Sequence, residues 1–449
     1  REFKEHAGDI LAAVDAETKK LYPQPDVKLD LTGKIRNGQI CVDQGVVAGC
    51  AGGTFENIWT MAELIGENAI GRGEFALSIY PASQPVNLEL IKKGAATKLL
   101  QSGATLRTAF CGPCFGAGDI PANGMLSIRH TTRNFPNREG SKPREGQLAA
   151  VALMDARSIA ATALRGGVLT AATELEPRPI PPVSYDFDRS VYRRRIYAGF
   201  GQADPEANLK YGPNITDWPE MRALPNDLIL KLAAVITDPV TTTDELIPSG
   251  ETSSYRSNPL KLAEFTLSRK DPDYVPKAKA FARLEQERRA WTKGQDLSVE
   301  LAQLMAAAAG VTGQTVEGLI TETGLGSALF AVKPGDGSAR EQAASCQKVL
   351  GGWANIAVEY ATKRYRSNLI NWGMLPFLLD LNHEELPFTK DDYIFIPDVV
   401  KAVQDKLTDV KAFVVKEDGL KEFNLKLGEL TDDEREIILK GCLINFNRR

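Results

Sequence analysis

Gly49-Cys50-Ala51-Gly52-Gly53 and Cys111-Gly112-Pro113-Cys114 are the two stretches that decide how this chain is organised. Two residues separate Cys111 from Cys114, so their thiolates can converge on one metal centre, while Gly112 permits unusual backbone angles and Pro113 fixes φ. Cys50 adds a third thiol from a glycine-rich turn, and no fourth cysteine stands at matching spacing. Three soft ligands with one position open are typical of an iron–sulfur cluster whose fourth iron is available for chemistry.

Spacing alone leaves other interpretations open. A C-x-x-C pair also occurs in thiol redox motifs, where Cys50 would have no role, and in zinc sites, which need a fourth ligand. The nearest histidine downstream of the pair is His130. The remaining cysteines lie in apolar sequence and are expected to be buried and inert; they are Cys41, Cys346 and Cys442.

Four motifs in order along the chain resemble the aconitase and isopropylmalate isomerase family. Cys50 with Cys111-Gly112-Pro113-Cys114 is similar to its cluster-ligand pattern, and Arg133-Asn134-Phe135-Pro136-Asn137-Arg138 to its R-N-F-x-x-R motif. Thr242-Thr243-Asp244 resembles its T-T-D motif, and Gly337-Ser338-Ala339-Arg340-Glu341 its G-S-S-R-E motif. The likeness is strongest to aconitase-like bacterial hydratases.

The resemblance implies a hydro-lyase that dehydrates or hydrates a di- or tricarboxylic hydroxy acid at a [4Fe–4S] cluster. It implies that Cys50, Cys111 and Cys114 are the cluster ligands. It implies catalytic roles for Ser338, which would be the base, and for Arg340 and Asp244. The residues implied to bind the carboxylates of the small polycarboxylate substrate are Arg133, Arg138, Arg256 and Arg340. Arg256 corresponds to an arginine associated with aconitase, which favours a citrate-like substrate.

Several positions depart from the family pattern. The family's S-C-T-N-S around the first cysteine is replaced by Gly49-Cys50-Ala51-Gly52-Gly53, and an asparagine before the first motif arginine by Thr132. Ala339 stands where a second serine is usual, and Glu245 follows Asp244 where a histidine is usual. The loss of these polar groups indicates a changed substrate or weakened activity.

Composition limits the classes of partner. The 449 residues are 43% hydrophobic and 25% charged with a formal net charge of −4, so bulk charge gives no support to a nucleic-acid or anionic-membrane surface. No apolar run reaches the roughly 18 residues of a transmembrane helix, and six cysteines without regular pairing fit a reducing compartment. We expect a cytoplasmic protein with the mitochondrial matrix as the alternative, no membrane partner, and no nucleic acid.

Three segments are expected. Residues 1–175 read as an aconitase-like α/β cluster domain with a parallel sheet, because apolar strands alternate with helical patterns and the cysteines follow strand ends. Residues 176–225 are rich in proline and read as a linker. Residues 226–449 read as a C-terminal α/β swivel domain, and the site is expected in the cleft between the two domains. The chain opens on Arg1 rather than Met. We therefore expect the family's N-terminal domains to lie on a longer chain or on a separate subunit.

The secondary-structure pattern is specific at several places. Thr54 is predicted to cap a helix through Ile65, and Phe75–Tyr80 to form a strand. One helix is predicted from Asn87 to Leu99, another over 147–164, and exposed helices over 277–310. Thr431 and Glu434 form a predicted capping box.

An alternative function is a non-catalytic iron or oxidant sensor that binds RNA after losing its cluster. Its only local support is the basic run Arg189-Ser190-Val191-Tyr192-Arg193-Arg194-Arg195. In an acidic protein such a run is more often a solvated or salt-bridged patch.

Overall fold

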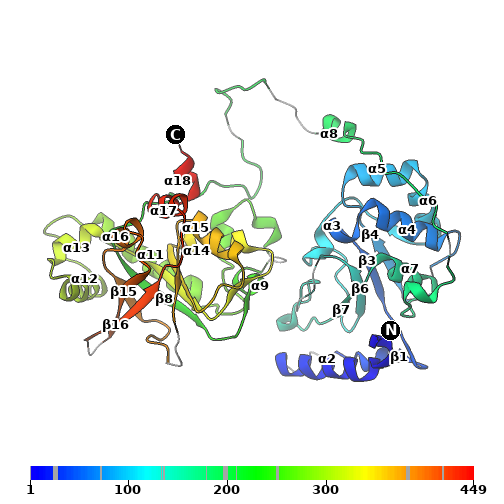
Figure 1. Cartoon of the computed structure of the whole chain (residues 1–449), viewed down its shortest axis with the longest axis horizontal. Coiled ribbons are helices and arrows are strands. Elements are labelled where there is room, and N and C mark those ends of the chain that lie inside the picture. Colours follow the sequence, from blue (N-terminus) through cyan, green and yellow to red (C-terminus); the bar gives the residue numbers. More distant parts are fainter. Residues whose placement is uncertain are drawn as a thin grey trace. The chain divides into compact units, whose positions relative to one another are not determined.

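The structure is a computed structural model in which the chain divides into two compact units, Arg1–Ala207 and Asn208–Arg449 (Figure 1). The described residues are 2–23, 29–70, 73–132, 134, 137–177, 179–195, 201–208, 210–248, 252–380, 385–416 and 419–448. Within the described part of the predicted linker 176–225, the regular element is the short helix α8 (Ser190–Arg195).

A parallel sheet in the order β5-β4-β3-β6-β7 forms the centre of the first unit. The chain moves from β3 to β4 and β5 on one side and then returns to place β6 and β7 on the other. The border between β3 and β6 is therefore a topological switch point, where ligands of open α/β sheets bind at the carboxyl ends of the strands. The strands are β3 (Gln44–Val47), β4 (Ala76–Ile79), β5 (Thr105–Leu106), β6 (Leu126–His130) and β7 (Ala150–Leu153).

Helices cover this sheet and close the core of the first unit. Helix α4 packs against α6 and α7, and α7 also contacts β3 and β6. The predicted cap is confirmed, because Thr54 Oγ1 accepts a hydrogen bond from Asn57 N. The helices of this unit, besides α8, are α1 (Glu2–Glu5), α2 (Ala7–Leu21), α3 (Gly49–Gly52), α4 (Phe55–Ile65), α5 (Gln84–Lys92), α6 (Ala95–Ser102) and α7 (Ala156–Leu164). Short elements complete it: β1 (Ile35–Arg36), β2 (Gln39–Ile40), and the 3₁₀ turns η1 (Thr32–Lys34), η2 (Gly112–Cys114), η3 (Pro143–Glu145) and η4 (Ala172–Glu174).

Two predicted helices of the first unit are wrong in extent. The helix expected from Asn87 to Leu99 is split into α5 and α6, because Gly94 adopts φ +82° and breaks the helical path. The helix expected over 147–164 begins only at Ala156, because the carboxylate of Asp155 caps it by accepting from Arg157 N and Ser158 N. The residues before that cap pair with β6 as strand β7.

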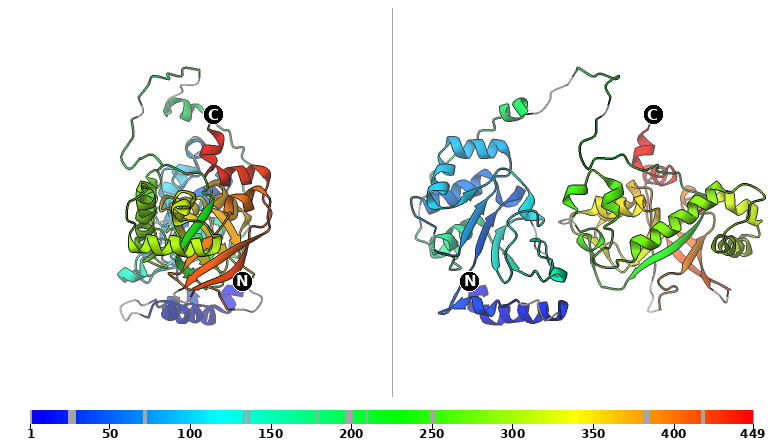
Figure 2. Two further views of the ribbon diagram at one scale, coloured as in Figure 1. Left: turned by 90° about the vertical axis from the view of Figure 1, so that its left-hand side faces the viewer. Right: turned by 180° about the vertical axis from the view of Figure 1, so that it is seen from behind.

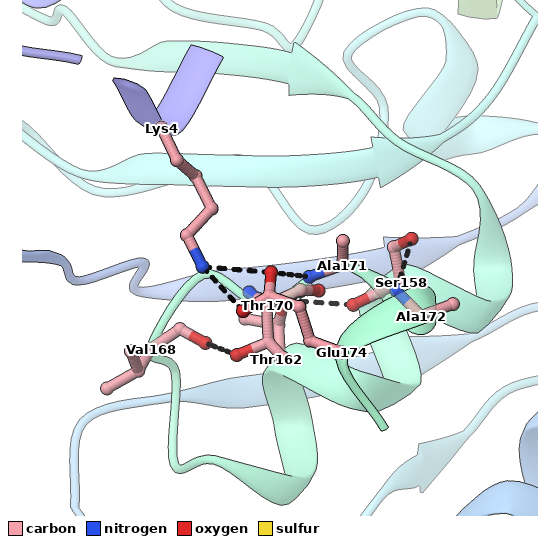
Figure 3. A network of polar contacts seen from close by, with 8 residues as sticks. All are labelled: Lys4, Ser158, Thr162, Val168, Thr170, Ala171, Ala172 and Glu174. Atoms are coloured by element: carbon pink, nitrogen blue, oxygen red, sulfur yellow. Dashed lines mark hydrogen bonds and ion pairs between the residues drawn. The ribbon is translucent and has the colours of Figure 1, made fainter. Parts of the chain in front are cut away.

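A polar network ties the start of the chain to the loop after α7 (Figure 3). Lys4 Nζ lies 2.8 Å from a carboxylate oxygen of Glu174, whose other oxygen accepts from Ala171 N. Thr162 Oγ1 in turn accepts from Thr170 N. Because the loop's backbone groups are paired in this way, helix α7 and the segment that follows it are held in one arrangement.

A closed barrel in the order β10-β12-β13-β16-β15-β14-β8 forms the second unit. Strands β8, β10, β12 and β13 run parallel, and β14, β15 and β16 join them antiparallel. Buried side chains alternate between the two faces of β8, with Leu228 and Leu230 in one core cluster and Ile229 in another. The strands are β8 (Asp227–Ile236), β10 (Thr323–Ala331), β12 (Gly352–Ala357), β13 (Leu375–Leu378), β14 (Tyr393–Ile396), β15 (Asp409–Lys416) and β16 (Gly419–Lys426).

The helices of the second unit pack outside the barrel, and α11 crosses β8 and β10 (Figure 2). The predicted exposure of 277–310 is wrong, because Phe281, Leu301 and Met305 are buried in a shared core cluster. The capping box of Thr431 and Glu434 is confirmed. The helices are α9 (Thr243–Leu246), α10 (Pro259–Ala263), α11 (Tyr274–Ala290), α12 (Val299–Thr312), α13 (Val316–Glu322), α14 (Arg340–Val349), α15 (Lys363–Asn371), α16 (Val399–Gln404), α17 (Asp432–Leu439) and α18 (Leu443–Asn447), with the 3₁₀ turn η5 (Ser253–Tyr255).

The predicted α/β class, with a parallel sheet in the first unit, is confirmed. Among the helices in the described part of the chain, none combines the length and the apolar character needed to cross a bilayer.

Candidate functional site

The predicted cysteine ligands lie after strand ends of the first unit. Cys50 belongs to α3, which begins two residues after β3. In the loop after β5, Cys111 directly precedes η2 and Cys114 is the last residue of η2. Helix α3 contacts η2, so the two cysteine-bearing segments meet. This meeting point lies at the carboxyl ends of parallel strands, the edge of an α/β sheet that collects functional groups.

The thiols of Cys111 and Cys114 are adjacent and both lie beside Gly49. A Cβ on Gly49, which adopts φ +72°, would be 2.6 Å from Cys114 Sγ and 3.8 Å from Cys111 Sγ. Cys50 follows Gly49 directly, so its Cα is about 3.8 Å from that of Gly49. Cys50 and Cys111 are exposed, whereas Cys114 is buried. The structure therefore brings the backbone positions of all three cysteines to one place, with two of the thiols open to a ligand.

Burial raises the pKa of the Cys114 thiol, and the neighbouring Cys111 thiol raises it further. The guanidinium of Arg138 acts in the opposite direction and favours the thiolate. A positively charged metal centre would supply the compensation that two adjacent thiolates require, because coordination deprotonates a thiol outright.

The donor set at this place consists of cysteine sulfur atoms. Within the described ranges, no group of three or more His, Cys, Asp or Glu side chains is arranged to hold one metal ion. The all-sulfur ligand chemistry is that of an iron–sulfur cluster.

Arg129 supports the Cys-Gly-Pro-Cys loop from inside the sheet. It lies on β6, is 1% exposed, and donates from Nη1 to Pro113 O at 3.0 Å. Its other nitrogens donate to Ser127 Oγ, to Gln44 Oε1 and to the backbone oxygen of Asp119. A buried guanidinium with these partners fixes the loop that carries Cys111 and Cys114.

Asp119 extends this support to the strand on the other side of β3. Its carboxylate accepts from Tyr80 Oη at 2.5 Å and from Ser78 Oγ at 3.2 Å. Burial and the Asp119 carboxylate raise the pKa of Tyr80 to about 12, so the phenol stays a hydrogen-bond donor across the physiological range. The residues around the cysteines are thus connected by a polar network, not by apolar packing alone.

The two arginines predicted to bind substrate from this unit have different outcomes. Arg133 lies outside the described residues. Arg138 donates from Nε to the backbone oxygen of Cys114 and from Nη2 to Thr132 Oγ1. The structure therefore places Arg138 against the cysteine loop, where its guanidinium contributes positive charge beside the thiols.

In the second unit, strand pairing brings together the two motifs that are far apart in sequence. Strand β9 (Thr241–Thr242) pairs with β11 (Pro334–Asp336), so Thr242 lies opposite Asp336. Ala339 N donates to Thr243 Oγ1 at 3.3 Å, and Gly337, with φ +135°, packs so closely that a Cβ would lie 2.1 Å from the same oxygen. Asp244 and Ser338 therefore belong to one local surface.

Ser338 is exposed immediately before α14, and Arg340 is the first residue of that helix. Asp244 forms an ion pair with Arg269, with Oδ2 2.9 Å from Nη1. Arg256 follows η5 and is exposed. Glu341, in the same motif as Ser338, accepts from Trp372 Nε1, and burial raises the pKa of its carboxyl group.

Sequence reasoning missed Arg129 and Arg269. Arg129 could have been identified from the sequence, because it lies within the apolar strand pattern Leu126-Ser127-Ile128-Arg129-His130, where a charged side chain is unusual. Arg269 had none, because its pairing with Asp244 depends on the path of the chain between them.

The fold and the site define an α/β protein whose first unit brings three cysteine positions together. The model of the aconitase family (aconitate hydratase) matches residues 6–161. Through this region the chain is similar to the aconitase family.

Similar curated proteins are 3-isopropylmalate dehydratase large subunits. That of Clostridioides difficile is 36% identical over 121 residues, covering 27% of this chain and 28% of the relative. That of Clostridium beijerinckii is 31% identical over 180 residues, covering 37% of this chain and 41% of the relative. The chain thus spans well under half the length of these relatives. A solved 3-isopropylmalate dehydratase structure from Methanocaldococcus jannaschii is 22% identical, with a TM-score of 0.28 over 49% of this chain and 92% of that one.

Proposed function

We propose that this chain is part of a hydro-lyase that reversibly dehydrates or hydrates a di- or tricarboxylic hydroxy acid at a [4Fe–4S] cluster held by Cys50, Cys111 and Cys114. The observation that carries the proposal is the adjacency of the Cys111 and Cys114 thiols to Gly49. It occurs at the carboxyl end of the parallel sheet, within the region that matches the aconitase family.

Removing water from a hydroxy acid needs a stabilised hydroxide leaving group and a base for a weakly acidic C–H proton. When bound, a cluster with one open iron supplies Lewis acidity toward the departing hydroxyl. Arginine suits the substrate carboxylates, because its planar fork binds them in a bidentate manner and stays charged. We assign this role to Arg133, Arg138, Arg256 and Arg340.

Ser338 is our proposed base. Ser338 is exposed two residues before Arg340, the first residue of the ten-residue helix α14, whose dipole favours negative charge at this end. Arg340 adds a cationic side chain two residues away, which lowers the cost of holding the serine as an alkoxide. Asp244, paired with Arg269, is proposed to orient this local surface.

The substrate is proposed to be a hydroxy acid with two or three carboxylates. The relatives are named for 3-isopropylmalate, whereas Arg256 favours a more highly charged, citrate-like acid. The matched relatives are large subunits, and we propose that the remaining family domains act with this chain from a longer polypeptide or a separate subunit. A cytoplasmic or mitochondrial-matrix location fits a reduced cysteine site. The relatives are dehydratases, which favours this function over an RNA-binding sensor.

The test begins with the protein prepared anaerobically. We expect iron and sulfide in the ratio of a cubane cluster, together with a broad visible absorption that oxygen bleaches. A panel of 2-isopropylmalate, citrate and malate, assayed by the appearance of the unsaturated acid, then identifies the substrate. Protein that binds no iron under these conditions contradicts the proposal, whatever its activity.

A further inference from the structure

Lys348 is a buried lysine in the second unit, far along α14 from the serine motif. It is 7% exposed, and Trp353, which it contacts, is 8% exposed. Its Nζ lies 3.6 Å from the centre of the Trp353 ring. Lysines are rarely buried without an acidic partner, so the surroundings of this ammonium group call for an explanation.

The polar partners of Lys348 are few. Its Nζ donates to Gly373 O over 3.5 Å, a long hydrogen bond, and no carboxylate lies within 4.0 Å of it in the described part of the chain. Burial, opposed by Cys442 and assisted by the positive charge of Arg222, lowers the pKa of Lys348 to about 7. A buried cation in this position is stabilised by the aromatic face and by one distant carbonyl, and lacks a counter-charge.

A cavity of about 220 Å³ adjoins this group. Its lining includes Lys348 and Trp353, the apolar side chains of Met221 and Leu325, and the charged pair of Arg222 and Glu285. The volume is below the roughly 300 Å³ at which pockets for drug-sized ligands begin, so a ligand here has few heavy atoms.

The acids of the cavity are already compensated. Glu285 Oε1 lies 3.3 Å from Arg222 Nη1, its Oε2 lies 2.7 Å from Arg288 Nε, and it also accepts from Leu325 N. Glu220 Oε2 lies 3.8 Å from Arg222 Nε, and the Glu220 side chain is 75% exposed. These carboxylates leave the ammonium of Lys348 as the buried charge that a ligand can neutralise.

We propose that this cavity binds a small organic carboxylate, with the Lys348 ammonium as its counter-charge and Trp353, Leu325 and Met221 around its apolar part. Mixed apolar and cationic lining favours a short carboxylic acid over inorganic phosphate, whose higher charge would need more donors than the cavity offers. The site is separate from the cysteine centre and from the Ser338 surface, and its occupation does not depend on the proposed reaction.

Such binding is coupled to protonation. The free site is mostly neutral above pH 7, and an anion favours the ammonium form, so binding raises the pKa of Lys348. The protein therefore takes up close to one proton per anion at pH 8. Affinity falls about tenfold for each pH unit above 7. The other charged groups at the cavity are Arg222, Glu285 and Glu220, and the Cys442 thiol acts on Lys348 from outside the cavity lining.

Titration calorimetry of the intact chain with butyrate tests this. We expect saturable binding and, from paired buffers with different ionisation heats, proton uptake near one at pH 8. Lys348→Met should abolish binding, whereas Lys348→Arg should retain binding and lose the proton uptake, because arginine stays charged. Lys293→Met, at a lysine whose side chain is 82% exposed, is the matched control and should bind like the parent.

Three outcomes overturn the proposal. The first is no saturable heat with butyrate, and the second is binding of phosphate but not butyrate, which would make the site an inorganic-anion site. The third is butyrate binding by the parent protein without proton uptake, a result that needs no variant to fold. Thermal unfolding of each variant confirms that loss of binding is not loss of structure.

Discussion

The cysteine centre of the first unit and the serine surface of the second unit are built by opposite means. Around Cys50 the backbone is packed so tightly that a Cβ on Gly52 would lie 2.0 Å from His130 O, and one on Gly53 would lie 2.3 Å from Tyr80 O. Ser338, by contrast, is exposed in the segment after β11, which is joined to the neighbouring motif by its pairing with β9 and by the hydrogen bond from Ala339 N to Thr243 Oγ1.

The difference indicates what each region is for. Close backbone packing and a buried arginine network hold ligands in fixed positions, which is what a metal centre needs. An exposed hydroxyl before a helix is free to meet a substrate. Substitutions in the first region should therefore change what the protein holds, and substitutions in the second should change only what it does.

The largest effect is expected from Cys111→Ser. A hydroxyl does not replace a thiolate as a ligand for a soft metal, so we expect iron and sulfide to be lost completely from anaerobically prepared protein. Cys41→Ser, at a cysteine outside the centre, is the control and should keep its iron. Equal iron in both variants would show that Cys111 is not a ligand.

Ser338→Ala should lower the activity and leave the iron content unchanged. We expect kcat to fall about 10²–10⁴-fold, the range for loss of a general base, with iron content unchanged. The stability should change by no more than about 0.5 kcal/mol, because the side chain is exposed. Ser254→Ala, also at an exposed serine, should keep full activity. A loss of iron in Ser338→Ala would remove the distinction between the two regions.

Arg129→Met sharpens the comparison within the first unit. Removing the guanidinium leaves buried carbonyl oxygens without donors, so we expect a loss of about 3 kcal/mol in the free energy of unfolding together with lower iron content. Denaturant unfolding and iron analysis measure the two effects. Arg107→Met, at a side chain that is 50% exposed, should cost less than about 1 kcal/mol. Wild-type stability in Arg129→Met would mean that the network is not structural.

The smallest effect is expected from Arg269→Met in the second unit. The Arg269 side chain is 29% exposed, so loss of the pair should cost about 1 kcal/mol, read from the denaturation midpoint. Lys406→Met breaks the exposed pair with Asp432 and should leave that midpoint unchanged. An equal effect in both variants would argue against a special role for Asp244.

The sequence by itself determined the α/β class, the parallel sheet of the first unit and the Thr54 cap. These features follow from local spacing, because strands, caps and C-x-x-C pairs are defined by residues close together in the chain. Local spacing did not separate β7 from α7, because a run of small apolar residues fits a strand as well as a helix until the Asp155 cap fixes the start of the helix. It did not separate α5 from α6 either, because the helical pattern continues across the left-handed Gly94.

Only the tertiary structure decided which distant groups meet. Four features join residues that are distant in the sequence. They are the Cys111 and Cys114 thiols beside Gly49, the hydrogen bond from Arg129 to Pro113, the ion pair of Asp244 with Arg269, and the cavity at Lys348. Their positions depend on strand order and on barrel closure, which no short window of sequence encodes. The burial that lowers the pKa of Lys348 likewise exists only in the folded chain.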